Sequence, residues 1–507
     1  MQTSVGAMVT NSAKIFGDKT ALVFDSKTWS FNDIDRMSTR LALQLKYMGV
    51  RFGDVVSLYS PNCPEWIISY YGIMKAGAIV NPLNLMLTAS EAAFAISDCN
   101  AIGVIGASDR LENLMDFLPQ TELLFRVSFG ISTDSEIVRF SELLESAVDV
   151  SNFSIDAEVS GLSISTIAYT SGTTGHPKGA VLSHEAILLN TAMTATMHMR
   201  TASDVVVSAL PLSHVYGNIV MNTAIAYGMT LVLHKSFDAT QVLSSIEVNR
   251  ATIFDGVPTM YAYLLDHPDI RNFDLSSLTR CTVGGQVMPV AKMRKVEEIF
   301  DCQLLEVWGM TEIGGLGCTH SLYGASRLGS IGTSLPHLSI RITSTDDPSC
   351  VLPVGEIGEL QVKGAIVMKG YLGKQEATLE TLWDDGWLRT GDLARMDEDN
   401  FVYILDRLKD MIITAGFNIY PAELERVIAE HPDVSMVAVG GINDDLKGEL
   451  AKAYVVRRKG AELSAEELVE FCRSRLAAYK IPRAVQFVDD LPKTSSGKIM
   501  RRKLTDL

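Results

Sequence analysis

Residues 169–179, YTSGTTGHPKG, are crowded with serine, threonine and glycine and end in a lysine and a glycine. Glycine lets backbone N–H groups approach an anion closely, and the hydroxyls and Lys178 add donors and a positive charge. Such a loop suits a triphosphate whose charge is held while one phosphorus is attacked. It is not a GxxxxGK[ST] loop, because Gly179 follows Lys178, and the chain has no GxGxxG. A surface loop of this composition is the alternative.

The length and charge of the chain narrow the function classes. A chain of 507 residues is too long for one ordinary core, so at least two domains are expected. The net charge of −16 argues against nucleic acid as the main partner, because phosphate backbones need a basic face. The 7 cysteines form no CxxC pair, which predicts thiols in a reducing compartment. With no secretory signal visible, we predict a cytoplasmic location.

One stretch could be mistaken for a membrane span. Between Asp204 and His234 the chain carries no charged residue, and only His214 is ionisable near neutral pH. The stretch is long enough to cross a bilayer, but Pro211 and several polar residues interrupt it. We therefore predict a buried strand, a polar loop and a buried helix, and no transmembrane span.

The N-terminal part alternates apolar strands with helices. A helix is predicted from Asn32, as N-cap, to Gly49, because apolar residues recur there at helical spacing. Strands are predicted at 54–60, 78–83 and 101–106, and helices at 64–77 and 90–98. Short strands alternating with helices indicate parallel sheets covered on both faces.

The C-terminal part has a different pattern. Residues 338–364 alternate apolar and polar residues between Gly, Pro and Asp turns, which predicts a small barrel or sandwich. A last α/β unit begins near Asp406, with helices at 421–432 and 464–476 and strands at 435–442, 451–458 and 484–490. Nothing resembles a low-complexity linker, so a tight hinge is expected at 406–409.

The loop at residues 169–179 resembles the phosphate loop of the adenylate-forming superfamily. This superfamily includes acyl-CoA synthetases, aryl-CoA ligases, beetle luciferases and nonribosomal adenylation domains. Further motifs follow in the family's order and approximate spacing. They are PLSHVYG (211–217), VGGQVMP (283–289), EVWGMTE (306–312), GSIGTSLP (329–336), GEIGEL (355–360), GYLGKQEAT (370–378), GWLRTGDLA (386–394), DRLKDMIITAGFNIYPAELE (406–425) and LPKTSSGKIMRR (491–502). The set extends to the last residues of the chain, and it points to the acyl-CoA synthetase branch.

The resemblance implies an α/β fold with two domains. The adenylation domain would span residues 1–406, with two parallel α/β sheets and a β-barrel-like subdomain at about 336–405. A small, mobile α+β domain would span residues 407–507. Lys409 would be the hinge about which this domain rotates.

The resemblance also implies a two-step reaction. ATP activates a carboxylic acid as an acyl-adenylate, with release of pyrophosphate, and the acyl group then passes to a thiol. Glu312 would hold Mg²⁺, and Thr311 would contact the α-phosphate. The β- and γ-phosphates would be cradled by Thr170, Ser171, Gly172, Thr173, Thr174, Gly175 and Lys178.

The adenosine site follows from the same motifs. Asp392 would accept hydrogen bonds from the ribose hydroxyls, with Arg407 beside it. Gly285, Gln286, Trp308 and Gly309 would form the adenine slot. Tyrosine is usual in the family where Trp308 stands. The exchange keeps a flat stacking face but removes a hydroxyl, which puts any polar role at this position in doubt.

The catalytic lysine is expected near the C-terminus. Lys498 would contact the carboxylate and the α-phosphate as negative charge builds up. Rotation of the C-terminal domain would then replace it with the segment around Gly416, where the pantetheine thiol passes close to the backbone. Lysines of this type are acetylated in the family, so a lysine acetyltransferase is a candidate partner for Lys498.

The predicted acyl pocket is neutral and mostly apolar. It comprises His214, Tyr216, Asn218, Met221, Val257, Thr259, Met260, Gly284, Gly285, Ile313, Gly314 and Gly315. The resemblance implies that His214 is also a catalytic residue, whose side chain moves with the stage of the reaction. The lack of an acidic or arginine residue favours a hydrophobic monocarboxylate over an amino acid or a second carboxylate. Glycines 314, 315 and 317 are expected to leave space for an extended chain or a ring, so fatty, alicyclic and aromatic acids all stay open.

CoA is the expected acceptor, since no carrier domain follows the C-terminal domain in this sequence. An acyl-AMP ligase that delivers to a separate carrier protein is the first alternative, and a luciferase-like oxygenating enzyme is a more distant one. A sensor that binds nucleotide without turnover is disfavoured, because Glu312, Asp392, Arg407 and Lys498 are all present. A homodimer is compatible with the sequence.

Overall fold

The computed structural model describes residues 4–118, 123–132, 134–146, 153–155, 158–170, 177–414, 417–444, 448–494 and 497–507. Several residues predicted to contact phosphate or thiol lie outside this described part: Ser171, Gly172, Thr173, Thr174, Gly175 and Gly416.

The first sheet contains the three strands predicted at 54–60, 78–83 and 101–106, which are β3, β4 and β5. Its order is β7-β6-β5-β3-β4-β8-β9, parallel throughout except for the β8–β9 hairpin. All five residues of β3 are buried, as expected for a parallel strand covered on both faces. The strands are β3 (Val55–Tyr59), β4 (Ile79–Pro82), β5 (Ala101–Gly106), β6 (Phe125–Ser128), β7 (Val138–Arg139), β8 (Ile164–Thr170) and β9 (Lys178–Ser183).

The second sheet has the order β16-β15-β14-β13-β12-β10-β11-β1-β2. It is parallel from β14 to β1 and antiparallel at both edges. The parallel pair β1–β11 aligns Leu22 with Leu231, and Thr230 Oγ1 donates to the carbonyl of Thr20, 210 residues away. The strands are β1 (Thr20–Phe24), β2 (Lys27–Ser30), β10 (Val205–Ser208), β11 (Thr230–Leu233), β12 (Ile253–Gly256), β13 (Arg280–Gly284), β14 (Gln303–Met310), β15 (Gly315–Thr319) and β16 (Thr333–Ser334).

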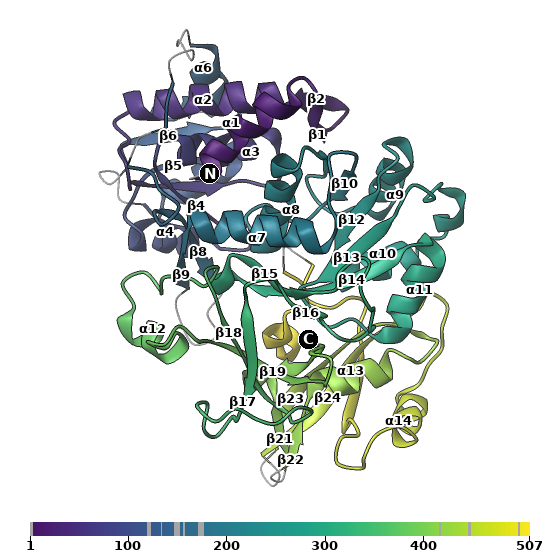
Figure 1. Ribbon diagram of the computed structural model, residues 1–507. Coiled ribbons are helices and arrows are strands. Elements are labelled where there is room, and N and C mark those ends of the chain that lie inside the picture. Colours follow the sequence, from purple (N-terminus) through teal and green to yellow (C-terminus); the bar gives the residue numbers. More distant parts are fainter. Residues whose placement is uncertain are drawn as a thin grey trace.

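Helices α7 and α8 cross between the two sheets (Figure 1). Helix α3 is almost entirely buried and packs on α8, where the hydroxyls of Tyr70 and Tyr71 donate to Asn218 and Asn222. The predicted cap of α2 is wrong: Ser30, not Asn32, is the N-cap, and it forms a capping box with Asp33. The helices of this domain are α1 (Val5–Phe16), α2 (Phe31–Tyr47), α3 (Pro64–Lys75), α4 (Ala89–Asp98), α5 (Ser108–Met115), α6 (Phe140–Glu145), α7 (His184–Met197), α8 (Val215–Ala226), α9 (Ala239–Val248), α10 (Pro258–Leu265) and α11 (Val290–Phe300), with 3₁₀ turns η1 (Ile270–Asn272) and η2 (Thr311–Ile313).

The uncharged stretch between Asp204 and His234 folds as β10, α8 and β11, so the predicted strand, loop and helix are confirmed, with β11 added. In the described parts of the chain, we find no helix with the length and apolar character needed to cross a membrane.

The β-rich subdomain is an antiparallel sheet in the order β17-β18-β19-β20. The barrel-like closure expected for it is wrong, because β17 and β20 form the two edges of an open sheet. Its elements are β17 (Ser339–Thr343), β18 (Gly358–Lys363), α12 (Gln375–Thr381), β19 (Leu388–Met396) and β20 (Val402–Arg407). The 3₁₀ turn η3 (Leu408–Asp410) follows directly and leads into the C-terminal domain.

The C-terminal domain has its own hydrophobic core, formed between helices α13 and α14 and a sheet in the order β22-β21-β24-β23, with β25 parallel to β24. Its predicted helices and strands are confirmed. The predicted elements are α13 (Pro421–Ile428), β23 (Val434–Asp444), β24 (Gly448–Arg457), α14 (Ala465–Arg473) and β25 (Ala484–Phe487). The structure adds β21 (Ile412–Thr414), β22 (Phe417–Ile419) and the 3₁₀ turn η4 (Arg501–Asp506).

The C-terminal domain packs on α10 and α11 of the large domain. Ala262 of α10 is buried in one cluster with Tyr454 and Leu504 of the small domain. Asp266, just beyond α10, accepts hydrogen bonds from Arg458 at 2.8 Å and from the Ser435 hydroxyl at 2.7 Å. These contacts fix one orientation of the small domain, and that orientation decides which of its loops faces the candidate site.

Candidate active site

Three predicted adenosine residues form one connected group. Asp392 of β19 and Arg407 of β20 are direct partners in the antiparallel pair, and Arg407 Nε lies 2.8 Å from Asp392 Oδ1. Trp308 of β14 donates its indole N–H to Asp392 Oδ2 at 2.8 Å. The doubt about a polar role for Trp308 is therefore wrong, because its indole nitrogen donates a hydrogen bond to Asp392.

The Asp392 carboxylate keeps acceptor capacity for a ligand. A carboxylate offers about four lone-pair sites; in the described part of the chain, Trp308 forms a hydrogen bond with one oxygen and Arg407 an ion pair with the other. Asp392 is 3% exposed, so the side chain is oriented by the protein before any ligand arrives. This arrangement fits the predicted hydrogen bonds from two ribose hydroxyls.

Glu312 lies in η2, at the end of β14 and therefore close in sequence to Trp308. Its carboxylate Oε1 accepts a hydrogen bond from the Tyr371 hydroxyl at 2.8 Å, and its backbone carbonyl accepts from the Met368 N–H at 2.7 Å. Glu312 is buried, and Thr311 beside it is half-buried.

Glu312 is suited to Mg²⁺ of the kind that accompanies ATP. Among the residues that the structure describes, no group of three or more His, Cys, Asp or Glu side chains could hold a metal alone. Mg²⁺ usually takes one or two carboxylates and completes its octahedron with water and phosphate oxygens. The single oriented carboxylate of Glu312, with ATP phosphates supplying further oxygens, fits this coordination.

The stretch 169–179, predicted to bind phosphate, begins in β8 and ends in β9. Thr170 ends β8 and Lys178 begins β9, and the two residues are paired in register. Lys178 Nζ lies 5.3 Å from the centre of the Tyr371 ring. The loop therefore starts and ends at the edge of the first sheet, and its terminal lysine shares Tyr371 with Glu312.

The Lys498 loop is docked against the large domain. The Thr259 hydroxyl donates to the Gly497 carbonyl at 2.7 Å, and the Ile499 N–H donates to Gln286 Oε1 at 3.0 Å. Gly497 has φ +82°, and a Cβ there would lie 2.8 Å from Thr259 Oγ1. The loop therefore needs glycine next to the lysine, and Gln286 serves as an interdomain contact as well as a predicted adenine-slot residue.

Burial changes the charge states of two predicted catalytic residues. Burial, with a contribution from the Arg407 charge, lowers the pKa of Lys498 to about 8, against an opposing effect of Asp392. Burial and the Lys498 charge lower the pKa of His214 to about 4, so the imidazole is neutral at pH 7. The site thus combines a titratable ammonium with a neutral imidazole.

The segment after Lys498 is anchored by one arginine. Arg501 contacts Asp406 at 2.7 Å, Glu425 at 2.7 Å and Asp410 at 3.2 Å, and all three acids belong to the hinge region or to α13. Lys409, the predicted hinge, lies in η3 between Asp406 and Asp410. The position of the Lys498 loop is therefore tied to the conformation of the hinge.

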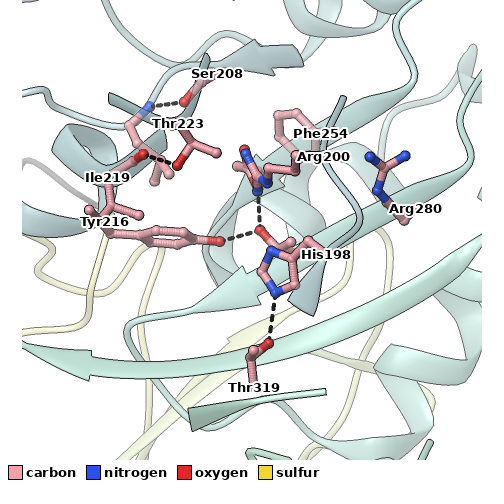
Figure 2. Close-up of polar contacts among 12 residues, drawn as sticks. His198, Arg200, Ser208, Tyr216, Ile219, Thr223, Phe254, Arg280 and Thr319 are labelled. Carbon is pink, nitrogen blue, oxygen red and sulfur yellow. Dashed lines mark hydrogen bonds and ion pairs between the residues drawn. The ribbon is translucent and has the colours of Figure 1, made fainter. Parts of the chain in front are cut away.

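The predicted pocket residues on α8 have well-defined neighbours. His214 is the N-cap of α8, and its Nδ1 accepts from the Tyr216 N–H at 3.2 Å. The Tyr216 hydroxyl lies 2.5 Å from Thr282 Oγ1, which donates to Asp255, itself paired with Arg200 at 2.7 Å. Figure 2 shows Tyr216 pointing into this buried polar group, where His198 is hydrogen-bonded to Thr319. The backbone N–H and the side-chain hydroxyl of Tyr216 are thus both hydrogen-bonded.

The glycines after Glu312 do not leave the open space expected of them. A Cβ on Gly314 would lie 3.3 Å from Ile187 Cδ1, one on Gly315 would lie 2.6 Å from Ile219 Cγ1, and one on Gly317 would lie 2.5 Å from Trp308 Cζ3. Side chains of the protein occupy these positions, so the glycines allow α7 and α8 to pack closely on β15.

The other predicted pocket and slot residues lie around the same site. Val257 Cγ1 would be 3.5 Å from a Cβ on Gly285, and Tyr216 Cε1 would be 3.5 Å from one on Gly284. Asn218 accepts a hydrogen bond from Tyr70 at 3.1 Å. Several of the remaining residues are buried: Met221, Met260 and Ile313. The backbone of β14 at Gly309 passes against Gly315 of β15, where a Cβ would be 2.0 Å from the Gly315 carbonyl oxygen.

Sequence reasoning missed Asn190 of α7. Its side-chain amide donates to the carbonyls of Ile313 and Leu316, at 3.2 and 2.8 Å, and its oxygen accepts from the Leu316 N–H at 3.2 Å. Asn190 therefore fixes the backbone that follows Glu312. A lone asparagine in a helix gave no signal of this contact.

Comparisons with known proteins agree with this geometry. A model of the AMP-binding enzyme family matches residues 9–372, and a model of the AMP-binding enzyme C-terminal domain matches residues 423–498. A long-chain-fatty-acid–CoA ligase of Bacillus subtilis (strain 168) is 37% identical over 530 residues, which cover 99% of this chain and 94% of the relative.

Two solved structures are similar over nearly the whole chain. A crystal structure of the anthranilate CoA ligase AuaEII in complex with anthranoyl-AMP has a TM-score of 0.93 at 27% identity, covering 100% of this chain and 97% of its own. The o-succinylbenzoate coenzyme A synthetase MenE of Bacillus subtilis, in complex with ATP and a magnesium ion, has a TM-score of 0.84 at 31% identity, covering 98% of this chain and 99% of its own. The three similar proteins are named for three different acids.

Proposed function

The chain belongs to the AMP-binding enzyme family, and we propose that it is an ATP-dependent acyl-CoA ligase that acts on a hydrophobic monocarboxylic acid. The observation that carries this proposal is the docked Lys498 loop. It buries an ammonium close enough to Arg407 and Asp392 for both charges to shift its pKa. A lysine delivered from a separate domain to a nucleotide site supports a role in the chemistry of adenylation.

In the first half-reaction, a carboxylate oxygen of the acid attacks the α-phosphorus of ATP, and pyrophosphate leaves. Lys498 stabilises the negative charge that develops on the carboxylate and the α-phosphate. Asp392 and Arg407 hold the ribose, while Lys178 holds the phosphates that leave. Mg²⁺, held by Glu312, would neutralise phosphate charge. Because His214 is neutral, it neither forms an ion pair with the substrate carboxylate nor repels the Lys498 ammonium.

In the second half-reaction, the thiol of CoA attacks the acyl carbonyl, and AMP leaves. Lys498 and the CoA thiol would have to reach the adenylate from the same side. The small domain must therefore rotate between the two steps, so that Lys498 leaves before the thiol enters. Lys409 lies in a short 3₁₀ turn between the two domains, which supports its role as the hinge.

The acid is inferred from the charges around the predicted pocket. Arg200 is the cation closest along the hydrogen-bond chain from Tyr216, and it is already paired with Asp255 through two hydrogen bonds. A second carboxylate on the substrate would lack a free cation there, which supports a monocarboxylic acid. Whether the natural acid is fatty, alicyclic or aromatic is the question for experiment.

CoA is the proposed acceptor, and a separate carrier protein is the alternative. A cytoplasmic location, a homodimer and acetylation of Lys498 stay predictions.

The test is a panel of fatty, alicyclic and aromatic acids, assayed for pyrophosphate and AMP release with and without CoA. We expect at least one acid to give AMP together with stoichiometric loss of free thiol. AMP release that needs a carrier protein and ignores CoA would favour the alternative. ATP binding without pyrophosphate from any acid would contradict the proposal.

A further inference from the structure

Tyr371 lies between two residues that the proposed function assigns to phosphate chemistry. Its hydroxyl donates to Glu312 Oε1 at 2.8 Å, and the Lys178 ammonium stands 5.3 Å from the centre of its ring. Glu312 follows β14 of the second sheet, whereas Lys178 begins β9 of the first sheet. One side chain therefore contacts groups from both sheets.

The backbone fixes where Tyr371 stands. Residues 369–372 run beside β9 like an added strand: the Val181 N–H donates to the Gly370 carbonyl at 3.0 Å, and the Leu372 N–H donates to the Gly179 carbonyl at 2.8 Å. Ala180 and Tyr371 form an antiparallel bridge, and the Tyr371 N–H donates to Thr378 Oγ1 at 2.9 Å. The ring is therefore placed relative to Lys178 by main-chain hydrogen bonds.

The hydroxyl is suited to orient a carboxylate. Within the described part of the chain, Tyr371 is the one side chain whose hydrogen bond to the Glu312 carboxylate is seen. A phenol is an O–H donor at neutral pH, and the hydrogen bond to Oε1 is its contact with the carboxylate. The bond uses Oε1, and no described residue forms a hydrogen bond with Oε2.

The ring face is suited to a cation. An ammonium within about 6 Å of an aromatic centre is attracted by the ring quadrupole. Lys178 needs such a restraint, because its stem is long and flexible and it ends the loop expected to hold phosphate. The ring provides the restraint without forming an ion pair that would compete with phosphate.

We infer that Tyr371 is a positioning residue for the pyrophosphate-forming half-reaction: it holds the Glu312 carboxylate and the Lys178 ammonium at a fixed separation, ready for the divalent cation and the phosphates. This inference rests on the proposed function. It concerns the cation and nucleotide, so its test can be read by binding without any acid or turnover.

The test compares Tyr371→Phe, Tyr371→Leu and the wild type. Calorimetry measures binding of α,β-methylene-ATP across a Mg²⁺ series, with melting temperatures recorded for each protein. Tyr371→Phe should raise the Mg²⁺ concentration for half-maximal binding roughly tenfold, through loss of one hydrogen bond to a charged group. Metal-free binding should not change, because the ring remains under Lys178. Tyr371→Leu should also weaken metal-free binding about threefold.

Tyr403→Phe is the matched control, because the Tyr403 hydroxyl donates to a different carboxylate, on Asp397, in the β-rich subdomain. A double-mutant cycle adds Glu312→Gln. If Tyr371 acts through Glu312, Tyr371→Phe should change the Mg²⁺ dependence little in that background.

An unchanged Mg²⁺ dependence in Tyr371→Phe overturns the inference, and so do effects that add fully to those of Glu312→Gln. If Tyr371→Phe does not fold, Tyr371→Leu takes its place, and unchanged metal-free binding of that variant then counts against the inference. The proposed function fails separately, when the wild type releases no pyrophosphate with any acid.

Discussion

The indole N–H of Trp308 donates a hydrogen bond to Asp392 Oδ2, and the guanidinium of Arg407 forms an ion pair with Oδ1, each at 2.8 Å. Trp308 belongs to the large parallel sheet, while Asp392 and Arg407 belong to the β-rich subdomain. The orientation of the predicted ribose ligand is therefore determined by contacts between two separately folded sheets.

We predict that Trp308→Phe weakens nucleotide binding while leaving the stacking face in place. A hydrogen bond to a charged group contributes about 1.5–3 kcal/mol, so the dissociation constant of an ATP analogue should rise about tenfold or more. Calorimetry measures it. Trp383→Phe, which stands near Arg341 in the subdomain, is the control. Equal affinity of Trp308→Phe and wild type would show that the contact does not orient Asp392.

We predict that Lys498→Ala separates the two half-reactions. Pyrophosphate release should fall by roughly a hundredfold or more, the scale of losing one donor to a developing oxyanion. Conversion of a synthetic acyl-adenylate to the CoA thioester should stay close to the wild-type rate, because the lysine leaves the site for that step. Quenched-flow measurement of each half-reaction checks this, and a normal pyrophosphate rate would count against the assignment.

A pH profile tests the charge state of the same residue. Burial, together with the Arg407 charge, lowers the pKa of Lys498 to about 8, so the ammonium is present below that pH and is lost above it. The kcat/KM for pyrophosphate release, which reports the free enzyme, should therefore fall about tenfold per pH unit above pH 8. Lys498→Arg stays charged and should lack this alkaline decline, whatever its absolute rate.

We predict that Lys409→Pro spares adenylation and blocks thioester formation. Lys409 is the middle residue of η3, and the φ typical of a 3₁₀ turn, about −50 to −70°, is compatible with proline. Rotation needs other backbone angles at the hinge, which proline cannot adopt. Thioester formation from a synthetic adenylate should fall by about a hundredfold, the scale of losing correct positioning. Equal loss of both half-reactions would contradict a hinge at this residue.

Asp266 provides a milder test of domain orientation. Its contacts with Arg458 and Ser435 exist only while the small domain is docked as described. Each exposed contact of this kind contributes up to about 1 kcal/mol, so Asp266→Ala should slow adenylation two- to fivefold. Asp269→Ala is the control, since the described contacts of Asp269 stay within its own loop. A thioester half-reaction slowed to the same extent would argue against an effect on orientation.

The sequence predicted the alternating α/β character of the N-terminal part and the helices and strands of the last α/β unit, because apolar strands and amphipathic helices leave periodic patterns. It failed where two local signals compete. Asn32 and Ser30 are both good N-caps, and the reciprocal bond with Asp33 selects Ser30. Closure of the β-rich subdomain was also mispredicted, since strand alternation does not reveal whether two edge strands meet.

Site residues could be predicted where they belong to a recognisable motif. Their hydrogen-bond partners could not be predicted where those partners lie far away in the sequence. Tyr371 lies in a motif that was recognised, yet its role depends on Glu312, which follows a different strand. Asn190 and the segment after Glu312 come from separate elements, and no local pattern connects them. For Trp308 the substitution was noticed, but its polar partner Asp392 could only be seen in three dimensions.

The pairing of β1 with β11 has a consequence for biosynthesis. The first strand emerges early from the ribosome, but its parallel neighbour is made about 200 residues later, a separation that makes such contacts slow to form. Until then Leu22 and its neighbours lack a sheet to join. The nascent chain must therefore keep this segment from aggregating, and a tag or truncation before residue 30 should reduce yield more than an equal change at a surface loop.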